Sequence, residues 1–228
     1  MSWYSPSPVE VQAIILSLWV AAVSVFFSLP LATGVAFLLA RRIFWGHGLL
    51  NALVHLPLVL PPVVTGYLLL IAFGRQGIFG PMLDALGLQL AFTSAGAAFA
   101  AAVMAFPLIV RAIRLAIEAV DPKLEEAAST LGASPLRVFG FVTLPLIVPG
   151  VLAGAVVGFA KALGEFGATI TFVSNIPGET QTIASAIYAF LQVPGQEAAV
   201  GRMIGFSILL SFGALLLSEV LARRMVRK

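Results

Sequence analysis

The sequence predicts an all-α integral membrane protein with five transmembrane helices, and it leaves a sixth crossing open. Of the 228 residues, 60% are hydrophobic and only 10% are charged, whereas a soluble domain carries about 25% charged residues. The mean hydropathy is +1.05. Several uncharged stretches reach the length of about 20 apolar residues that a helix needs to cross a bilayer. Residues 1–228 are therefore expected to form a single transmembrane domain.

Five long apolar runs are expected to cross the bilayer. They are, in order, Val11–Ala40, Leu49–Phe73, Ala91–Val110, Val142–Leu163 and Ala198–Leu221. The second run is interrupted by Pro57, Pro61 and Pro62, which lack an amide proton and must bend it. The carbonyls freed there need protein or water as partners, so the bend either lines a cavity or is a packing kink.

The segment 164–197 is apolar only in patches, because charged residues, prolines and a glycine break it at Glu165, Pro177, Gly178, Glu179 and Pro194. Its pieces are shorter than a bilayer span. We expect an extracytoplasmic surface or re-entrant segment here, with a short helix near Thr182–Leu191. A sixth crossing is the alternative.

The positive charges predict the orientation, because cytoplasmic loops collect Lys and Arg. Ten of the 13 Lys and Arg residues fall in three segments that five spans place on one side: Arg41 and Arg42; Arg111, Arg114, Lys123 and Arg137; Arg223, Arg224, Arg227 and Lys228. The C-terminus is therefore expected in the cytoplasm and the N-terminus outside. Trp3 and Tyr4 would then be aromatic residues at the outer interface, and Trp45 would lie at the inner one.

The composition excludes several classes of site and partner. Without cysteine, the chain has no disulfide, thiolate metal site or iron–sulfur cluster. Its two histidines, His47 and His55, have no carboxylate neighbour, and no metal site is expected. The net charge of +3 does not indicate a nucleic-acid partner. Glu10 precedes every Lys and Arg, unlike the basic start of a signal peptide, so we expect the first span to remain as an anchor.

The segment 121–145 carries helix start and stop signals. Asp121 can cap a helix that begins at Pro122, and Gly132 can end it in a left-handed conformation. Ser134 and Pro135 then start a second helix. We expect two short helices joined by a glycine elbow on the cytoplasmic side.

The spacing of residues in this segment resembles the EAA loop of binding-protein-dependent ABC importers. Glu126, Ala127 and Ala128 are followed by Gly132 after three residues, and nine further residues lead to Val142-Thr143-Leu144-Pro145. The family pattern has Ile at the place of Val142. The resemblance implies the type I ABC importer permease fold. It also implies that the first short helix docks on an ATPase subunit through Glu125, Glu126, Ala127, Ala128, Leu131, Gly132, Leu144 and Pro145.

The resemblance also implies partners. The chain has no phosphate-binding loop of the G-x-x-x-x-G-K-[ST] type. ATP and Mg²⁺ are therefore expected on a separate ATPase dimer. This chain is expected to be a transport subunit that binds no cofactor and is not an enzyme. The other implied partners are a second copy of the chain, an extracytoplasmic substrate-binding protein, an oxyanion and the lipid of a bacterial inner membrane. A stand-alone transporter or channel is the alternative, although we see no clear internal repeat or ion-binding charge within the spans.

Three passages resemble the molybdate permeases within this family: residues 55–70, 104–121 and 163–182. Permeases for sulfate, thiosulfate and tungstate have similar passages, so the anion remains open with molybdate favoured. The polar residues Thr169, Thr171, Ser174 and Asn175 are the candidate outer gate, because hydroxyls and amides can pass a hydrated dianion without trapping it. The bend at Pro57, Pro61 and Pro62 is the other candidate for the path.

Two further features of the fourth run predict contacts. Gly150, Gly154 and Gly158 place three notches on one helix face, where a helix of this chain or of a second copy could approach closely. Lys161 and Glu165 are four residues apart and can meet on one face. Lys161 then either attracts anions in a vestibule or reaches the lipid headgroups, which is the favoured interpretation.

Overall fold

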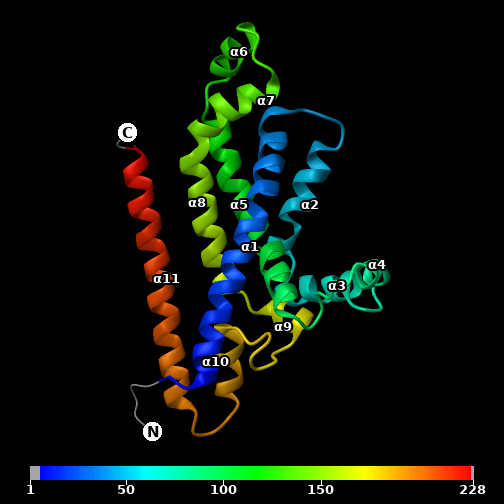
Figure 1. The fold of residues 1–228 in the computed structure, drawn as a ribbon, viewed down its shortest axis with the longest axis vertical. Coiled ribbons are helices and arrows are strands. Elements are labelled where there is room, and N and C mark those ends of the chain that lie inside the picture. The colour runs from blue at the N-terminus through cyan, green and yellow to red at the C-terminus, as the bar shows by residue number, and fades with distance from the viewer. Residues whose placement is uncertain (1–5, 227–228) are drawn as a thin grey trace.

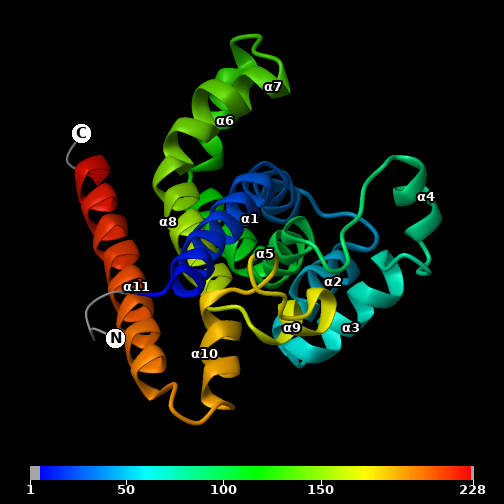
Figure 2. The ribbon, with the colours of Figure 1, turned by 60° about the horizontal axis from the view of Figure 1, so that its bottom comes forward.

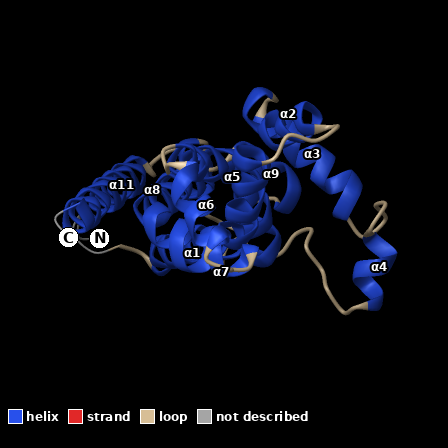
Figure 3. Cartoon of the chain, turned by 90° about the horizontal axis from the view of Figure 1, so that it is seen from above, coloured by secondary structure: helices blue, strands red, loops and turns tan. Residues whose placement is uncertain are grey.

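A computed structural model describes residues 6–226, and all regular structure within that range is helical (Figures 1 and 3). Trp3 and Tyr4 lie outside the described residues. The helices are α1 (Pro8–Arg41), α2 (His47–Val59), α3 (Pro62–Phe73), α4 (Gly80–Ala85), α5 (Ser94–Glu118), α6 (Pro122–Thr130), α7 (Pro135–Val138), the π-helix η1 (Phe139–Thr143), α8 (Leu144–Leu163), α9 (Gly167–Val173), α10 (Ile183–Leu191) and α11 (Glu197–Val226).

Four helical units within residues 6–226 are long and apolar enough to cross a membrane: Pro8–Arg41, Ser94–Glu118, Pro135–Leu163 and Glu197–Leu216. The pair α2 and α3 makes a fifth unit if it is counted as one broken span. The sixth crossing is not found in this part of the chain, because α9 and α10 have only 7 and 9 residues. The short helix expected near Thr182–Leu191 is present as α10.

The second run, which the sequence predicted to bend at its prolines, is divided into two helices at Pro61. The axes of α2 and α3 differ by 116°, and α3 runs sideways out of the bundle toward α4 (Figure 1). A residue before proline is driven out of helical geometry. Leu60 and Pro61 both precede a proline, and their ψ angles of 143° and 134° are extended. The two consecutive prolines therefore break the helix instead of bending it.

The fourth run also begins earlier than expected. Pro135 starts a continuous helical run through α7, η1 and α8 up to Leu163. The second short helix of the predicted pair is thus the first turn of the fourth span. The π-helix η1 joins α7 to α8 without a break in the backbone hydrogen bonding.

The core lies where α5 packs against α1 and α8 (Figure 2). Ile109, Ile113 and Ile117 of α5 are fully buried. The glycine notches of α8 face this helix: a Cβ atom at Gly158 would lie 2.6 Å from Ile109 Cδ1, and one at Gly150 would overlap Ala116 Cβ. The partner of the notches is therefore α5 of the same chain. Glycine lets the two backbones approach closely, as in other membrane helix pairs.

A second close approach joins the irregular part of the chain to the broken span. Gly66 of α3 lies against the backbone of Ala168 in α9, and Gly167 lies against Pro62. The short helix α9 thus packs against α3, near the end of the bundle opposite α6 (Figures 1 and 2). In the same figures α11 stands to one side of the bundle, next to α8 and α10.

We expect Gly150→Ala to destabilise the bundle, because α5 and α8 must separate to admit the methyl group, and overpacking typically costs about 1–3 kcal/mol. Gly205→Ala in α11 is the matched control, since nothing lies within 4 Å of its Cβ position. Alanine in a helix is favoured over glycine by roughly 0.5–1 kcal/mol, so the control should be as stable as the parent or slightly more stable. Thermal unfolding in detergent measures both, and an unchanged midpoint for Gly150→Ala would contradict the close α5–α8 packing.

Candidate functional site

The segment between α5 and α8 projects from one end of the bundle, with α6 and α7 at its tip (Figure 1). Asp121 caps α6 by accepting a hydrogen bond from the Lys123 amide (3.0 Å), and Pro122 is the first helical residue. Gly132 ends the turn with φ +85°. Its amide donates to Ser129 O (3.0 Å). The cap, the proline and the glycine therefore have the conformations that the sequence predicted.

The tip exposes a surface that is apolar and acidic. No residue of α6 is buried, and Glu126 is exposed. Apolar side chains of the elbow, and one in the following η1, are also exposed: Leu131 by 90%, Leu136 by 84% and, in η1, Phe141 by 82%. Large exposed apolar side chains grouped in this way mark interaction surfaces. We call this set, Glu126, Leu131, Leu136 and Phe141, the elbow surface.

Glu125 does not belong to the elbow surface, although the sequence suggested that it faces a partner together with Glu126. Its carboxylate turns inward, where Oε1 accepts hydrogen bonds from Thr143 Oγ1 (2.8 Å) and Arg41 Nη2 (3.3 Å). Arg41 Nε lies 3.1 Å from Oε2. We call the group Arg41, Glu125 and Thr143 the α6 joint. Adjacent residues on a helix point in different directions, about 100° apart, and this separates the two glutamates.

A hollow of about 710 Å³ lies under α6, between this helix, the end of α1 and the run that starts at Pro135. The α6 joint lines it, together with Phe37, Arg42, Glu126, Ser129 and Phe139. The space beneath α6 is therefore open, in contrast to the close-packed helices of the core. Apolar burial does not hold α6 in place.

The remaining residues of the predicted docking set lie in different surroundings. Ala127 is exposed and Ala128 is half-buried, as close approach of a partner requires. Leu144 and Pro145 are the first two residues of α8, after the π-helix and away from the tip of the elbow. They start the fourth helix and do not extend the elbow surface.

The four residues of the candidate gate do not form one polar cluster. The hydroxyls of Thr169 and Thr171 donate to carbonyls of their own turn, Phe166 O and Gly167 O, each at 2.9 Å. Residues two apart also point to opposite sides of a helix. Ser174 is exposed, with φ +65°, and Asn175 Nδ2 donates to Ser185 O (3.4 Å). Thr169, Thr171 and Asn175 thus donate to backbone carbonyls of the same segment.

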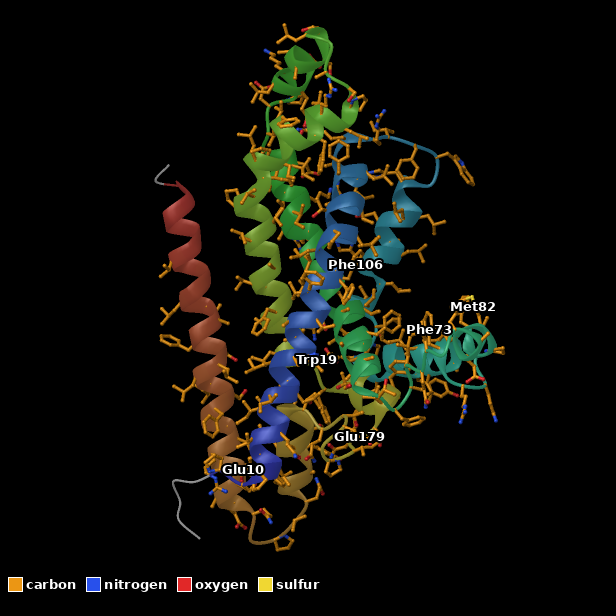
Figure 4. The ribbon with its side chains drawn as sticks, viewed as in Figure 1. Glu10, Trp19, Phe73, Met82, Phe106 and Glu179 are labelled. Carbon is orange, nitrogen blue, oxygen red and sulfur yellow. The ribbon has the colours of Figure 1, made fainter. Side chains whose placement is uncertain are left out.

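Pro57 lies in α2, beside an open apolar groove of about 480 Å³ between α1, α2 and α5. Phe27, Leu31, Leu53 and Phe106 line this groove with it. Phe106 marks its position near the middle of the bundle in Figure 4, whereas Phe73 and Met82 lie out along the arm formed by α3 and α4. Pro61 and Pro62 form the break between α2 and α3 and do not line the groove. The three prolines thus have two different roles in the fold.

Two ion pairs lie toward the end of the bundle opposite α6. Lys161 Nζ lies 2.7 Å from Glu165 Oε2, as their spacing predicted, and the buried Glu165 also accepts from the Ala168 amide (3.0 Å). The second pair was not predicted: Arg202 donates to both carboxylate oxygens of the buried Glu10, at 3.0 and 2.7 Å. Glu10 lies beside the start of α11 in Figure 4. The sequence signal that could have indicated this pair is one acidic residue, Glu10, and one basic residue, Arg202, each near the start of an apolar helix.

The contacts of Glu125 predict different effects for two adjacent mutations. Hydrogen bonds to charged groups contribute about 1.5–3 kcal/mol, so in Glu125→Ala the local opening of residues 122–134 should rise roughly 10- to 100-fold. Glu126→Ala removes no described contact and is the matched control. Hydrogen exchange measured by mass spectrometry on the chain in detergent reports both, and equal exchange in the two variants would contradict the inward position of Glu125.

Comparison with known proteins places this geometry in a family. A sequence model described as binding-protein-dependent transport system inner membrane component matches residues 28–227. The molybdenum transport system permease protein ModB of Haemophilus influenzae is 59% identical over 220 residues, which cover 96% of both chains. The sulfate transport system permease protein CysT of Salmonella typhimurium is 34% identical. The alignment covers 99% of this chain and 84% of CysT.

Solved structures share the fold at low sequence identity. The inward-facing MetNI methionine ABC transporter has a TM-score of 0.76 at 18% identity, covering 95% of this chain and 96% of that one. A bacterial ABC transporter that imports alginate has a TM-score of 0.73 at 20% identity, covering 96% and 80%. The chain has the type I ABC importer permease fold. It belongs to the family of binding-protein-dependent transport system inner membrane components.

Proposed function

We propose that this chain is the membrane permease of an ABC importer that carries molybdate into the cell, driven by an ATPase on a separate chain. The observation that carries the proposal is the elbow surface, an exposed apolar and acidic tip on a bundle of apolar helices. Similarity to a molybdenum transport permease over 96% of both chains supports the choice of anion. The chain is a transport subunit and not an enzyme.

The elbow surface suits an ATPase partner. Exposed leucines and Phe141 offer apolar area, and Glu126 offers a charge for an Arg or Lys of that partner. ATP and Mg²⁺ would bind to the partner alone. Two copies of this chain would form one central path and would sit on an ATPase dimer. Closure of the dimer would then push the two copies of α6 together and open the path to the outside, which is alternating access.

The orientation follows from where the basic residues lie. Arg41 ends α1, Lys123 lies in α6 and Arg137 lies in α7, so positive charge gathers at the end of the bundle that carries α6. Cytoplasmic segments collect such charge. We place this end and the C-terminus in the cytoplasm and the N-terminus outside, in a bacterial inner membrane. A soluble receptor would deliver the anion at the opposite end.

Sulfate is the second candidate substrate. The sulfate permease of Salmonella typhimurium is similar over 99% of this chain, although the identity is 34% and not 59%. Molybdate and sulfate are both tetrahedral dianions. No described contact at the candidate gate or at the prolines of the second run distinguishes one from the other. The receptor would therefore make most of the selection, and the permease would admit what the receptor releases.

The proposal predicts ATP-driven accumulation of molybdate. The chain should be reconstituted in vesicles with its ATPase and receptor, and uptake of molybdate and of sulfate should be measured with Mg-ATP on the ATPase side. We expect molybdate to accumulate at least tenfold faster than sulfate, which corresponds to about 1.4 kcal/mol of selectivity. Vesicles that lack the ATPase are the control. Uphill uptake in that control would contradict an ATP-driven importer, and a preference for sulfate would favour the second candidate.

The glycine of the elbow provides a second test. Proline cannot adopt the φ of +85° of Gly132 and cannot donate the hydrogen bond to Ser129 O. We expect Gly132→Pro to displace α6 and to raise the ATP hydrolysed per molybdate about tenfold or more, as loss of an aligned coupling contact would. Gly195→Pro is the matched control, because Gly195 also has a left-handed φ (+86°) and donates an amide hydrogen bond, but lies between α10 and α11. Normal uptake per ATP in Gly132→Pro would contradict the role of the elbow.

A further inference from the structure

We infer that the α6 joint is the connection through which a displacement of α6 reaches the transmembrane helices, and that Glu125 and Glu126 have different roles in this coupling. Glu126 faces the partner, whereas Glu125 transmits the movement to α1 and α8. The inference rests on the proposed function, because it concerns how the same elbow drives the bundle. Arg41, Glu125 and Thr143 are positioning residues and need not touch the transported anion.

The attachment of α6 gives the first argument. No residue of α6 is buried, and a hollow of about 710 Å³ separates it from the end of the bundle. Among the described side chains, the hydrogen bonds that leave α6 for other helices are those of Glu125 with Arg41 and Thr143. The covalent connections to α5 and α7 are short loops around Asp121 and Gly132. A push on α6 is therefore passed on by these loops and by one polar group.

The geometry of the joint gives the second argument. Arg41 is the last residue of α1, and its Nη2 also donates to Val120 O (2.8 Å), two residues after the end of α5. Thr143 is the last residue of η1, immediately before α8. The joint thus connects α6 to the ends of the three helices that pack together in the core. Movement of Glu125 acts on α1, α5 and α8 at the same end.

Burial makes the joint stiff. Thr143 is fully buried, and its hydroxyl donates to Glu125, so a loss of the carboxylate leaves a buried donor without its described partner. Such a group is costly to leave unpaired. Arg41 and Glu125 are each mostly buried, with side-chain exposures of 15% and 17%, which protects the pair from screening by salt. The joint is therefore expected to persist while α6 moves.

The π-helix η1 gives the third argument. This π-helix contains Thr143, whose hydroxyl donates to Glu125, and it lies directly between the elbow and α8. π-Helical turns are rare and occur frequently at functional sites. The joint therefore ends on an irregular turn that leads directly into α8, one of the helices packed against α5.

The test measures coupling and not stability alone. The complete importer, with its ATPase and receptor, should be reconstituted in vesicles, and the ATP hydrolysed per molybdate taken up should be determined for Arg41→Glu, Glu125→Arg and the double variant. Each single variant places two like charges together, and we expect the ratio to rise about tenfold. The double variant restores an ion pair, and Thr143 Oγ1 can accept from an arginine. We expect it to return to within about threefold of the parent, because the bond to Val120 O is lost.

Thr143 provides a pair of milder variants if the charge reversals prevent assembly. Thr143→Ser keeps the hydroxyl and should leave the ratio unchanged, whereas the nearly isosteric Thr143→Val removes the donor and should raise the ratio several-fold. Glu118→Gln is the control for loss of a carboxylate at this end of the bundle, since Glu118 pairs only with Arg114 of its own helix in the described contacts. It should couple as the parent does.

Two outcomes would overturn the inference. One is an unchanged ratio in both single variants and in Thr143→Val; the other is a double variant that assembles but stays as uncoupled as the single variants. Either would make the joint a contact for stability alone. The parent importer is measured first, so a parent that shows no ATP-driven uptake of molybdate refutes the proposed function and is distinguished from a failure of the joint.

Discussion

Lipid cannot solvate a charge or an unpaired backbone group, and this constraint determines the arrangement of the described chain. Every span is helical because a helix satisfies its backbone hydrogen bonds internally. The carboxylates buried near the end opposite α6, Glu10 and Glu165, are each paired with a basic residue. The elbow that carries α6 lies beyond one end of the bundle, where water can satisfy its polar groups.

Features that depend on local chemistry could be predicted from the sequence. The spans follow from apolar length, and the start and end of α6 follow from Asp121, Pro122 and Gly132. The pair Lys161 and Glu165 follows from helical spacing alone. In each case, the residues that decide the outcome lie within one helix or at its two ends, so no knowledge of the tertiary structure is needed.

Features that depend on distant partners could not be predicted in this way. The inward turn of Glu125 requires Arg41, which is 84 residues away, and the pairing of Glu10 with Arg202 joins the two ends of the chain. In the candidate gate, Thr169 and Thr171 donate to carbonyls of their own helix turn, and the role of this segment in transport stays a prediction. The break at Pro61 is a local effect, whereas the contact of Gly66 in α3 with Ala168 in α9 joins residues far apart in the sequence.

The absence of buried residues in α6 has a consequence for how such importers diversify. A helix that contributes nothing to the core can accept substitutions on its outer face with little penalty to folding. Changes at a few surface positions of α6 could therefore adapt the same bundle to a different ATPase. The surface of α6 that would meet an ATPase and the helices around the core can therefore change separately in sequence, since no residue of α6 is buried in that core.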